Sequence, residues 1–460
     1  MKFAHGRPVS RAGYGERASH IRPASDPASI MPRIKSVRQI AEWRLCLGCG
    51  ACAYICPERR VRLVDIVEEG IRPVVGSDDC ASCVDCLKVC PGFESDHTEI
   101  NRRTGVISEL TQSCGPVLEL WEGHATDEEI RFAGASGGVI TALALYCLER
   151  EAMYGVLHIG MDPQDALRNR TMMSRTRAEL LRNTGSRYAP ASACDGLHLI
   201  ESAPAECVFI GQPAEVTALR KAELLRPVLG QKVGLTISFF CAGSPATQGT
   251  LDLLKKMGID ASEVQDLRYR GMGWPGMFSA TLKGEAKRVQ QMSYQESWGA
   301  IQACRPLSTH LCPDGTGEDA DISCGDPWYR GTSKDEPGLS LILVRTETGR
   351  RLLQGAMAAG HLALEPAEPW QLMRSQKNLM IKRGAVGGRI ATMKALGLPV
   401  PRLRGFALLK NWRRLSLAAK LRSTVGTLRR VIKRRYYRPL RLPAGDGSTA
   451  SSLVRTGRGH

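Results

Sequence analysis

Eight cysteines between residues 46 and 90 have the spacing of iron–sulfur ligands. They form two runs, CLGCGACAYICPE and CASCVDCLKVCPG, and each run follows the pattern C-x2-C-x2-C-x3-C-P. The two-residue gaps let three thiolates converge on one cubane and leave backbone N–H groups facing its sulfurs. The ligand residues are Cys46, Cys49, Cys52, Cys56, Cys80, Cys83, Cys86 and Cys90. The sequence therefore predicts two 4Fe–4S clusters and, with them, the transfer of single electrons.

The fourth cysteine of each run is expected to bind the cluster of the other run, as in bacterial two-cluster ferredoxins. Zinc is the alternative metal, but zinc sites use pairs of cysteines instead of triplets. The segment VRLVDIVEEGIRPVV between the runs alternates apolar and polar residues around Gly70, which is typical of a short hairpin. The two expected ligand sets are Cys46, Cys49, Cys52 and Cys90, and Cys80, Cys83, Cys86 and Cys56.

Composition places these cysteines in a reducing compartment. Half of the 16 cysteines lie in the two runs, where they suit metal and not disulfides, so we expect a cytoplasmic protein. No stretch of about 18 apolar residues predicts a transmembrane helix. The N-terminus lacks the apolar core of a secretory signal, although its arginine-rich, acid-poor composition also fits a transit peptide. Met31 is an alternative start.

Elements of an α/β architecture follow the cysteine runs. A glycine-rich turn leads into a helix from about Gly138. A strand is predicted at 207–210, with a loop at 211–213 and then a helix; a second strand at 233–240 is followed by a loop at 241–245 and a helix from about Thr247. The expected domains are a disordered basic arm at 1–37, a 2x(4Fe–4S) ferredoxin domain at 38–97, a core in two parts at 110–200 and 201–400, and a basic tail at 401–460.

The positive charge of the chain is concentrated in this tail. The formal net charge is +17, and residues 401–460 hold sixteen Lys and Arg against one acidic residue, Asp446. Residues 406–439 place apolar side chains near helical spacing with cations between them, which favours an amphipathic helix on anionic lipid. An acidic partner protein and a plain solvated helix are the alternatives. Nucleic acid is not expected, because the aromatic residues form no stacking platform.

The region from about 110 to 400 resembles the beta subunit family of coenzyme F420 hydrogenases and dehydrogenases, which includes 7-hydroxymethyl chlorophyll a reductase. The order and number of the matching stretches carry the resemblance, since no single one is decisive. The stretches are GASGGVITAL, TGSRYAPAS, FIGQPAEVTALRK, FFCAGSP, YRGMGWPG and LCPDGTGEDADISCGDPW. The resemblance implies an α+β ferredoxin-like 2x(4Fe–4S) module followed by an α/β core that binds FAD.

The residues in these stretches have chemistry that suits a flavin. Ser136 to Gly138 open a helix whose free N–H groups can meet a phosphate. The loops after two strands lie where α/β sheets bind ligands. Tight glycine turns and solvated loops are the structural alternatives for the same residues. The expected cofactor contacts are Ser136, Gly137, Gly138, Thr141, Ser186, Arg187, Tyr188, Gly211, Pro213, Cys241, Gly243, Arg270 and Gly273.

Two positions depart from the family pattern. Many relatives have cysteine where this chain has Ala214 and Thr309, and some use such cysteines to hold a further cluster in the core. With those two replaced, a third cluster is not expected. Its nearest ligands would be Cys241, Cys304, Cys312 and Cys324, which are otherwise small buried residues. Acid–base candidates in the last stretch are His310, Asp314 and Asp326, and none is assigned a catalytic role.

The resulting hypothesis is an iron–sulfur, flavin-dependent oxidoreductase. Ferredoxin or another redox protein would exchange single electrons with the two clusters, and FAD would pass electron pairs to an organic substrate. Coenzyme F420 and an intermediate of a polysaccharide or lipid pathway are candidate substrates. The alternative is a non-catalytic electron-transfer subunit of a larger redox complex. We expect the protein in the cytoplasm, with peripheral contact to the inner face of the membrane through its tail.

Overall fold

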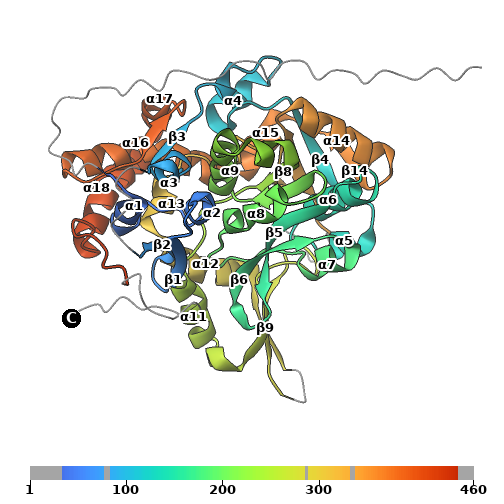
Figure 1. The fold of residues 1–460 in the computed structure, drawn as a ribbon, viewed down its shortest axis with the longest axis horizontal. Helices are drawn as coiled ribbons and strands as arrows, with labels where there is room; N and C mark the ends of the chain where they lie inside the picture. The colour runs from blue at the N-terminus through green and yellow to red at the C-terminus, as the bar shows by residue number, and fades with distance from the viewer. Residues whose placement is uncertain (1–33, 77–82, 285–287, 332–336, 444–460) are drawn as a thin grey trace, which may run out of the picture.

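The computed structural model of the chain describes residues 34–76, 83–284, 288–331 and 337–443. Cys80 and nearly all of the expected basic arm lie outside these ranges. A large sheet with its helices forms one half of the molecule, and the N-terminal and C-terminal segments lie together in the other half (Figure 1). Among the described residues, no helix has the length and apolarity needed to cross a membrane.

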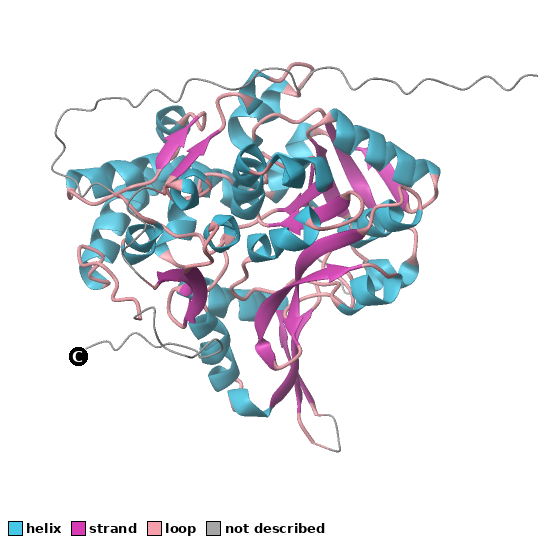
Figure 2. Cartoon of the chain, viewed as in Figure 1, coloured by secondary structure: helices cyan, strands magenta, loops and turns pink. Residues whose placement is uncertain are grey.

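The core of the protein is an eight-stranded mixed sheet (Figure 2). Its four central strands, β12, β8, β7 and β5, are parallel, and the strands outside them pair antiparallel. Central parallel strands are covered on both faces, so their sequences are continuous apolar runs. In sheet order the strands are β14 (Leu362–Pro366), β4 (Glu119–Ala125), β13 (Ser340–Val344), β12 (Ile322–Gly325), β8 (Val233–Phe239), β7 (Cys207–Gly211), β5 (Gly155–Asp162) and β6 (Asp165–Ser174). The strands predicted at 207–210 and 233–240 are confirmed.

Each face of the sheet packs against its own set of helices. On β5, Val156 faces the side covered by α6 (Val139–Glu149) and α14 (Glu347–Ala358). The next residue, Leu157, faces α8 (Leu197–Glu201), α9 (Pro213–Leu225) and α10 (Pro227–Lys232). The predicted helix starts are confirmed for α6, α9 and α11 (Thr247–Lys256). A separate three-stranded sheet contains β9 (Val264–Arg268), β10 (Met277–Leu282) and β11 (Val289–Ser293).

The N-terminal module is small and helical around one hairpin. Its strands β1 (Val61–Ile66) and β2 (Gly70–Val75) pair antiparallel, which confirms the predicted hairpin. Three short helices surround the two cysteine runs, α1 (Val37–Glu42), α2 (Ala51–Ile55) and α3 (Asp85–Lys88). Residues of α2 and the end of α3 join the core cluster under β5 and β7, so the module and the α/β core share one hydrophobic interior.

Backbone contacts fix the first cysteine run on the core. The N–H of Cys194 donates to the carbonyl of Cys49 at 3.0 Å, and the Ser192 hydroxyl donates to the carbonyl of Gly48 at 2.6 Å. Gly50 has φ of 88°, and a Cβ there would lie 2.8 Å from the Asp195 nitrogen. Only glycine allows this approach without a shift of the backbone. The segment after Ala189 is therefore held directly on the cluster-binding loop.

The basic C-terminal region packs against both the module and the core. Strand β15 (Arg402–Arg404) pairs parallel with β3 (Glu94–Asp96), and α17 (Leu408–Arg413) and α18 (Leu417–Lys433) lie on α16 (Lys377–Ala395). A Cβ on Gly388 of α16 would overlap the Ser423 hydroxyl of α18, so these helices are in close contact. The predicted amphipathic helix is present in α18, and residues 402–443 are integrated into the fold.

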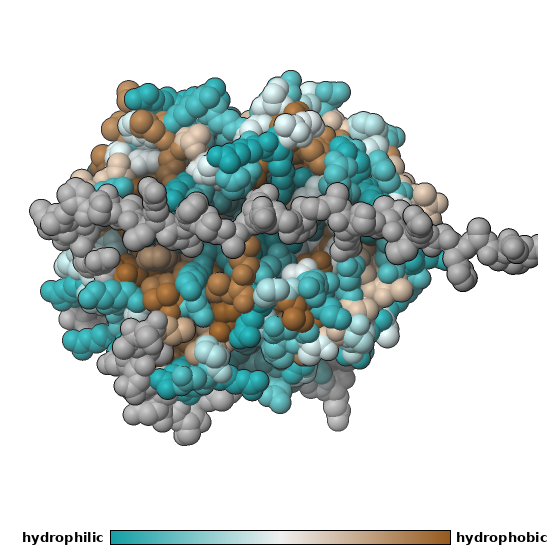
Figure 3. Space-filling model, turned by 45° about the horizontal axis from the view of Figure 1, so that its top comes forward, coloured by the Kyte–Doolittle hydropathy of each residue, from teal (hydrophilic) through white to brown (hydrophobic). Residues whose placement is uncertain are grey.

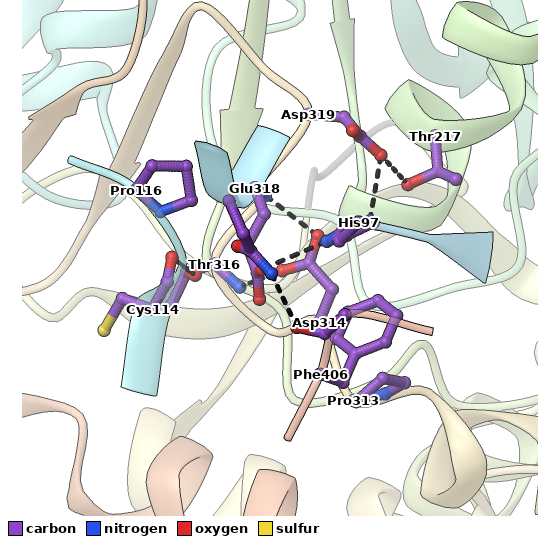
Figure 4. Close-up of polar contacts among 12 residues, drawn as sticks. His97, Cys114, Pro116, Thr217, Pro313, Asp314, Thr316, Glu318, Asp319 and Phe406 are labelled. Atoms are coloured by element: carbon purple, nitrogen blue, oxygen red, sulfur yellow. Dashed lines mark hydrogen bonds and ion pairs between the residues drawn. The ribbon is translucent and has the colours of Figure 1, made fainter. Parts of the chain in front are cut away.

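A buried ionic network links the end of the module to the loop that precedes β12 (Figure 4). His97 Nδ1 lies 3.0 Å from Glu318 Oε2, and His97 Nε2 lies 3.1 Å from Asp319 Oδ2. Arg383 of α16 pairs with the other oxygen of Glu318. Burial alone would lower the pKa of His97, but Asp319 and Glu318 raise it well above its usual value. His97 is therefore an imidazolium between two carboxylates.

Replacing His97 should destabilise the docked module. His97→Gln leaves Glu318 and Asp319 buried without their shared cation, and breaking such a pair costs about 3–5 kcal/mol. We expect a lower thermal midpoint, followed by loss of cluster absorbance on heating. Because the pKa is raised in the folded state, the His97 contribution is complete below about pH 6.5 and is lost as pH rises through the folded pKa.

The thermal midpoint of the wild type should therefore decrease as the pH rises through the folded pKa of His97. The midpoint of His97→Gln should not show this decrease. His198→Gln is the matched control, because His198 is exposed and bonds only a backbone carbonyl. Equal midpoints for the two variants would contradict the role of the network.

Candidate functional site

The thiols predicted to share one cluster lie together in the structure. Cys46, Cys49, Cys52 and Cys90 are all buried where the module meets the core. Burial raises the pKa of Cys49 and Cys52, and neighbouring thiols of the same set raise it further. The pKa of Cys90 is raised to about 12, by burial and then by Cys46. Four crowded thiols that repel one another as anions suit a group of positive irons, which stabilises thiolate ligands.

Backbone donors also face the sulfurs, as a cluster site requires. The N–H of Gly48 donates to the sulfur of Cys46 at 3.4 Å, and the N–H of Arg60 donates to the sulfur of Cys56 at 3.4 Å. Such N–H to sulfur contacts tune the potential of iron–sulfur clusters. The second ligand set is described only in part, because Cys80 lies outside the described residues. The residues present therefore fit the first cluster, and nothing in the described part of the second set conflicts with it.

A large cavity lies beside this module, at the carboxyl ends of β7, β8 and β12 and the N-terminal end of α6. It encloses about 1450 Å³ of open space, including solvent at its mouth. Ligands of open α/β sheets bind at this edge. Ten of the thirteen predicted cofactor contacts line it, although they come from five separate sequence stretches. They are Ser136, Gly138, Thr141, Ser186, Arg187, Tyr188, Gly211, Cys241, Gly243 and Arg270.

The other three predicted contacts lie near the cavity but not in its wall. Gly137 is behind it, with its N–H donating to the Ser340 hydroxyl at 3.0 Å. Pro213 begins α9 and faces a smaller neighbouring cavity. Gly273 lies in the loop after Arg270, where its N–H donates to the carbonyl of Phe132.

The two arginines expected to meet an anion are already bonded within the protein. Arg187 donates to backbone carbonyls of Ala166 and Leu267 at 2.7 and 2.6 Å. Arg270 forms a buried ion pair with Asp326 at 2.6 Å and donates to the carbonyl of Ala135. These guanidinium groups position the cavity wall, and they hold few donors in reserve for a ligand. The first turn of α6 also lines the cavity, and the first N–H groups of a helix have no acceptor within the helix.

Aromatic side chains surround the Arg270–Asp326 pair. Tyr294 stacks on Trp328 with ring centroids 5.5 Å apart and an interplanar angle of 4°. The Arg270 guanidinium lies 4.6 Å from the Tyr294 ring centroid, and Trp274 Nε1 donates to Asp326 at 2.9 Å. Of the acid–base candidates, Asp326 alone lines the large cavity, where it is a partner of Arg270. Asp314 accepts three backbone N–H groups, which is the role of a loop cap.

Glu215 is a cavity residue that the sequence analysis missed. Its carboxylate accepts N–H groups of Ala193 and Gln212, both at 2.8 Å, and burial raises its pKa to about 7. It therefore joins α9 to the segment that contacts the cluster loop. The three-residue spacing of Gln212 and Glu215 is a helix-capping pattern, and it was the one feature of the sequence that could have indicated a role for Glu215.

The four cysteines named for a third cluster do not come together. Cys241 and Cys312 line one cavity of about 570 Å³ between the module and the core, and Ala214 and Thr309 line the same cavity. Cys324 belongs to β12 and lines the large cavity, whereas the Cys304 thiol lies 3.7 Å from Asp252. Two thiols in one place are too few to hold a cubane cluster.

Comparison with known families agrees with this architecture. Residues 45–92 match the 4Fe-4S dicluster domain. Residues 120–197 match the N-terminal domain of the coenzyme F420 hydrogenase/dehydrogenase beta subunit, and residues 205–369 match its C-terminal domain. The iron–sulfur module and the resemblance of the core are thereby confirmed.

Several curated proteins are similar to the chain at low identity. It is 23% identical over 362 residues to the coenzyme F420-dependent sulfite reductase of Methanocaldococcus jannaschii, covering 74% of the chain and half of that protein. It is 26% identical over 288 residues to the coenzyme F420 hydrogenase subunit beta of Methanococcus voltae, covering 60% of the chain and 95% of that subunit. Similarity to the rice (Oryza sativa subsp. japonica) 7-hydroxymethyl chlorophyll a reductase is 26% over 354 residues, 72% of the chain and 71% of that protein.

The fold is also found among solved structures. A chain of the F420-reducing [NiFe] hydrogenase complex from Methanosarcina barkeri superposes with a TM-score of 0.51 at 22% identity. The superposition covers 63% of this chain and 98% of the other. The two domain matches, their order and the shared fold show that this chain belongs to the coenzyme F420 hydrogenase/dehydrogenase beta subunit family, with a 4Fe-4S dicluster domain preceding the core.

Proposed function

We propose that the chain is an iron–sulfur flavoprotein oxidoreductase that exchanges electrons between a one-electron donor, two 4Fe–4S clusters, FAD and an organic two-electron substrate. One observation carries the proposal. A cavity at the ligand-binding edge of the sheet is lined by Ser186 to Tyr188, and the same segment continues through Ala191 to the cluster-binding loop. A flavin in this cavity would supply the conversion between single-electron and two-electron transfer.

The chain's own residues would hold and orient such a group. Residues in the first turn of α6 line the cavity, and the first N–H groups of a helix have no acceptor within the helix, which suits the phosphates of a flavin nucleotide. Ile140, Ile159 and Ile210 give the wall apolar surface for a planar ring system. Glu215 lies between the cavity and Cys49 and fixes the spacing between them through the Ala193 N–H.

The donor and acceptor are parts of the same proposal. Ferredoxin or another redox protein is the proposed donor, because the clusters carry one electron each. Relatives that are F420 hydrogenase subunits support a redox protein as partner and make coenzyme F420 one candidate acceptor. The same relatives favour the second candidate function, a non-catalytic relay subunit in a larger complex. Flavin content separates the two functions.

Helix α18 supports the proposed peripheral contact with the membrane. Its outward face carries Leu417, Leu421, Val425, Leu428 and Ile432, which are 37–73% exposed. The inward face is small and polar, with Ser423 and Thr427 packed on α16. In most surface helices the larger apolar side chains face the core. In α18 they face solvent instead.

Charge favours a lipid surface over other partners for this stripe. Residues 405–443 contain no acidic residue, and cations flank the stripe along α18. On the face drawn in Figure 3, brown apolar groups alternate with teal polar ones in the half of the molecule that holds α16 to α18. An apolar stripe among cations binds anionic interfaces through burial and charge together. We therefore propose peripheral binding to anionic membranes through α18.

Anaerobically purified protein should contain about eight irons per chain and bind FAD. Ile140→Trp fills the cavity at the first turn of α6, and we expect it to weaken FAD binding at least about tenfold, measured by flavin fluorescence quenching. Ile381→Trp is the control, because Ile381 is exposed on α16. Full iron without FAD binding in the wild type would leave only the relay function. Two zinc ions in place of iron would refute both functions.

Wild-type protein should cosediment with phosphatidylglycerol vesicles and much less with phosphatidylcholine vesicles, and high salt should weaken the binding. The triple variant Leu421→Ser, Val425→Ser, Ile432→Ser should lose most of this binding with an unchanged cluster spectrum. Leu224→Ser is the control, since Leu224 is 80% exposed on α9. Unchanged vesicle binding by the triple variant would contradict the proposal. So would a wild-type dimer that the triple variant abolishes, because the stripe would then be a subunit interface.

A further inference from the structure

Four cations lie near one another around α13 (Leu307–Leu311): one from the turn that precedes this helix, two from α16 and one from α18. Arg305 donates to the carbonyl of Ala242 at 2.9 Å, and the Lys382 ammonium lies 3.5 Å from the carbonyl of the adjacent Cys241. Seven residues along α16 from Lys382, Arg389 donates to the carbonyl of His310 at 2.6 Å. Lys382 and Arg389 therefore lie on one face of α16, two turns apart. Arg430 is on α18, which packs on that helix, and it is close enough to Arg389 and His310 to lower the pKa of both groups.

These four side chains have no carboxylate partner among the residues that the structure describes. All are half-buried, and their strongest charged neighbours include one another. Burial, and then the charges of Arg430 and Arg305, lower the pKa of Arg389 to about 10. Burial and the four cations together lower the pKa of His310 to about 2, so this histidine stays neutral. Other arginines of this fold, such as Arg270 and Arg383, pair with acids at short range.

Grouping unpaired cations in partly buried positions costs free energy unless an anion joins them. We propose that Arg305, Lys382, Arg389 and Arg430 form a binding site for a multivalent oxyanion of the phosphate class. Several cations with guanidinium forks match the geometry and charge of phosphate oxygens better than those of a single carboxylate. Of the four cations, Lys382 alone lines the cavity beside this site, and that cavity shares three residues with the predicted flavin contacts, Pro213, Cys241 and Gly243. The binding test therefore uses an inorganic anion.

The cavity beside Lys382 offers a further donor, and the volume of this cavity includes solvent at its mouth. Lys382 and Ser308 line the 570 Å³ cavity, and the Ser308 hydroxyl is buried with no hydrogen-bond partner. Two carboxylates also line this cavity. Both oxygens of Asp314 accept backbone N–H groups, and Glu69 is paired with Arg44 and Arg72. An unpaired buried hydroxyl next to an ammonium group is the arrangement expected of an empty oxyanion pocket.

The site can be tested with inorganic pyrophosphate on the anaerobic, cluster-loaded protein. Titration calorimetry should show saturable binding to the wild type, and pyrophosphate should raise the thermal midpoint, because a ligand of the folded state stabilises it. Lys382→Gln and Arg389→Gln should each weaken binding by about 10-fold to 100-fold, since each removes a charge-assisted contact. Lys394→Gln is the matched control, because Lys394 is exposed on the same helix.

Two results would overturn the site. One is the lack of saturable binding to the wild type, and the other is equal weakening by Lys394→Gln, which would indicate general charge attraction. The cluster spectrum of each variant must match that of the wild type. Without ligand, Lys382→Gln should melt at the same temperature as the wild type, which would show that the substitution removes binding and not folding. Competition by ADP would identify a nucleotide as the source of the phosphate, and competition by phosphatidylglycerol vesicles a lipid headgroup. Either competition would support the site.

Discussion

Contact between the backbone of the first cysteine run and the segment after Ala189 is the constraint on which the rest of the structure depends. Gly50 permits that contact because any side chain there would strike Asp195, and two hydrogen bonds hold Gly48 and Cys49 against the same segment. This segment also forms part of the large cavity wall. The spacing between the cysteine run and the cavity is therefore set by direct backbone contacts.

The His97 network reinforces this docking at a second point. It lies at the end of the module, where β3 is paired with β15, and it reaches the loop that leads into β12. Because β12 also forms the cavity edge, the same loop supports both the module and the cavity. Burial of four ionic groups would be unfavourable in isolation, so loss of any one of them would leave an uncompensated charge in the interface. The C-terminal region is part of this arrangement, since Arg383 and Phe406 contact the network (Figure 4).

The sequence predicted helices and strands better than it predicted which side chains and backbone groups contact one another. Strands β7 and β8 and the helices after them follow from apolar runs with glycine and proline at their ends, which are local signals. The iron–sulfur module follows from cysteine spacing, which is a local signal too, and the eight ligand residues stay a prediction. Pairing of Arg187 and Arg270 was beyond the sequence, because it depends on carbonyls and carboxylates about 20 to 135 positions away. Glu215 was missed for the same reason, since its importance comes from Ala193 and the cluster loop.

Helix α18 shows that hydrophobic periodicity does not decide which face of a helix is buried. Periodicity identifies an apolar face and a polar face, and the usual expectation is that the apolar face is buried. Here α16 offers glycine at the contact, so the small face of α18 is the one that fits and the leucine face remains outside. The choice between the two orientations is made by the packing partner, which lies more than thirty residues earlier in the chain. The contact between α16 and α18 therefore has two consequences. The orientation of α18 that exposes Leu421 also places Arg430 near Arg305 and Arg389.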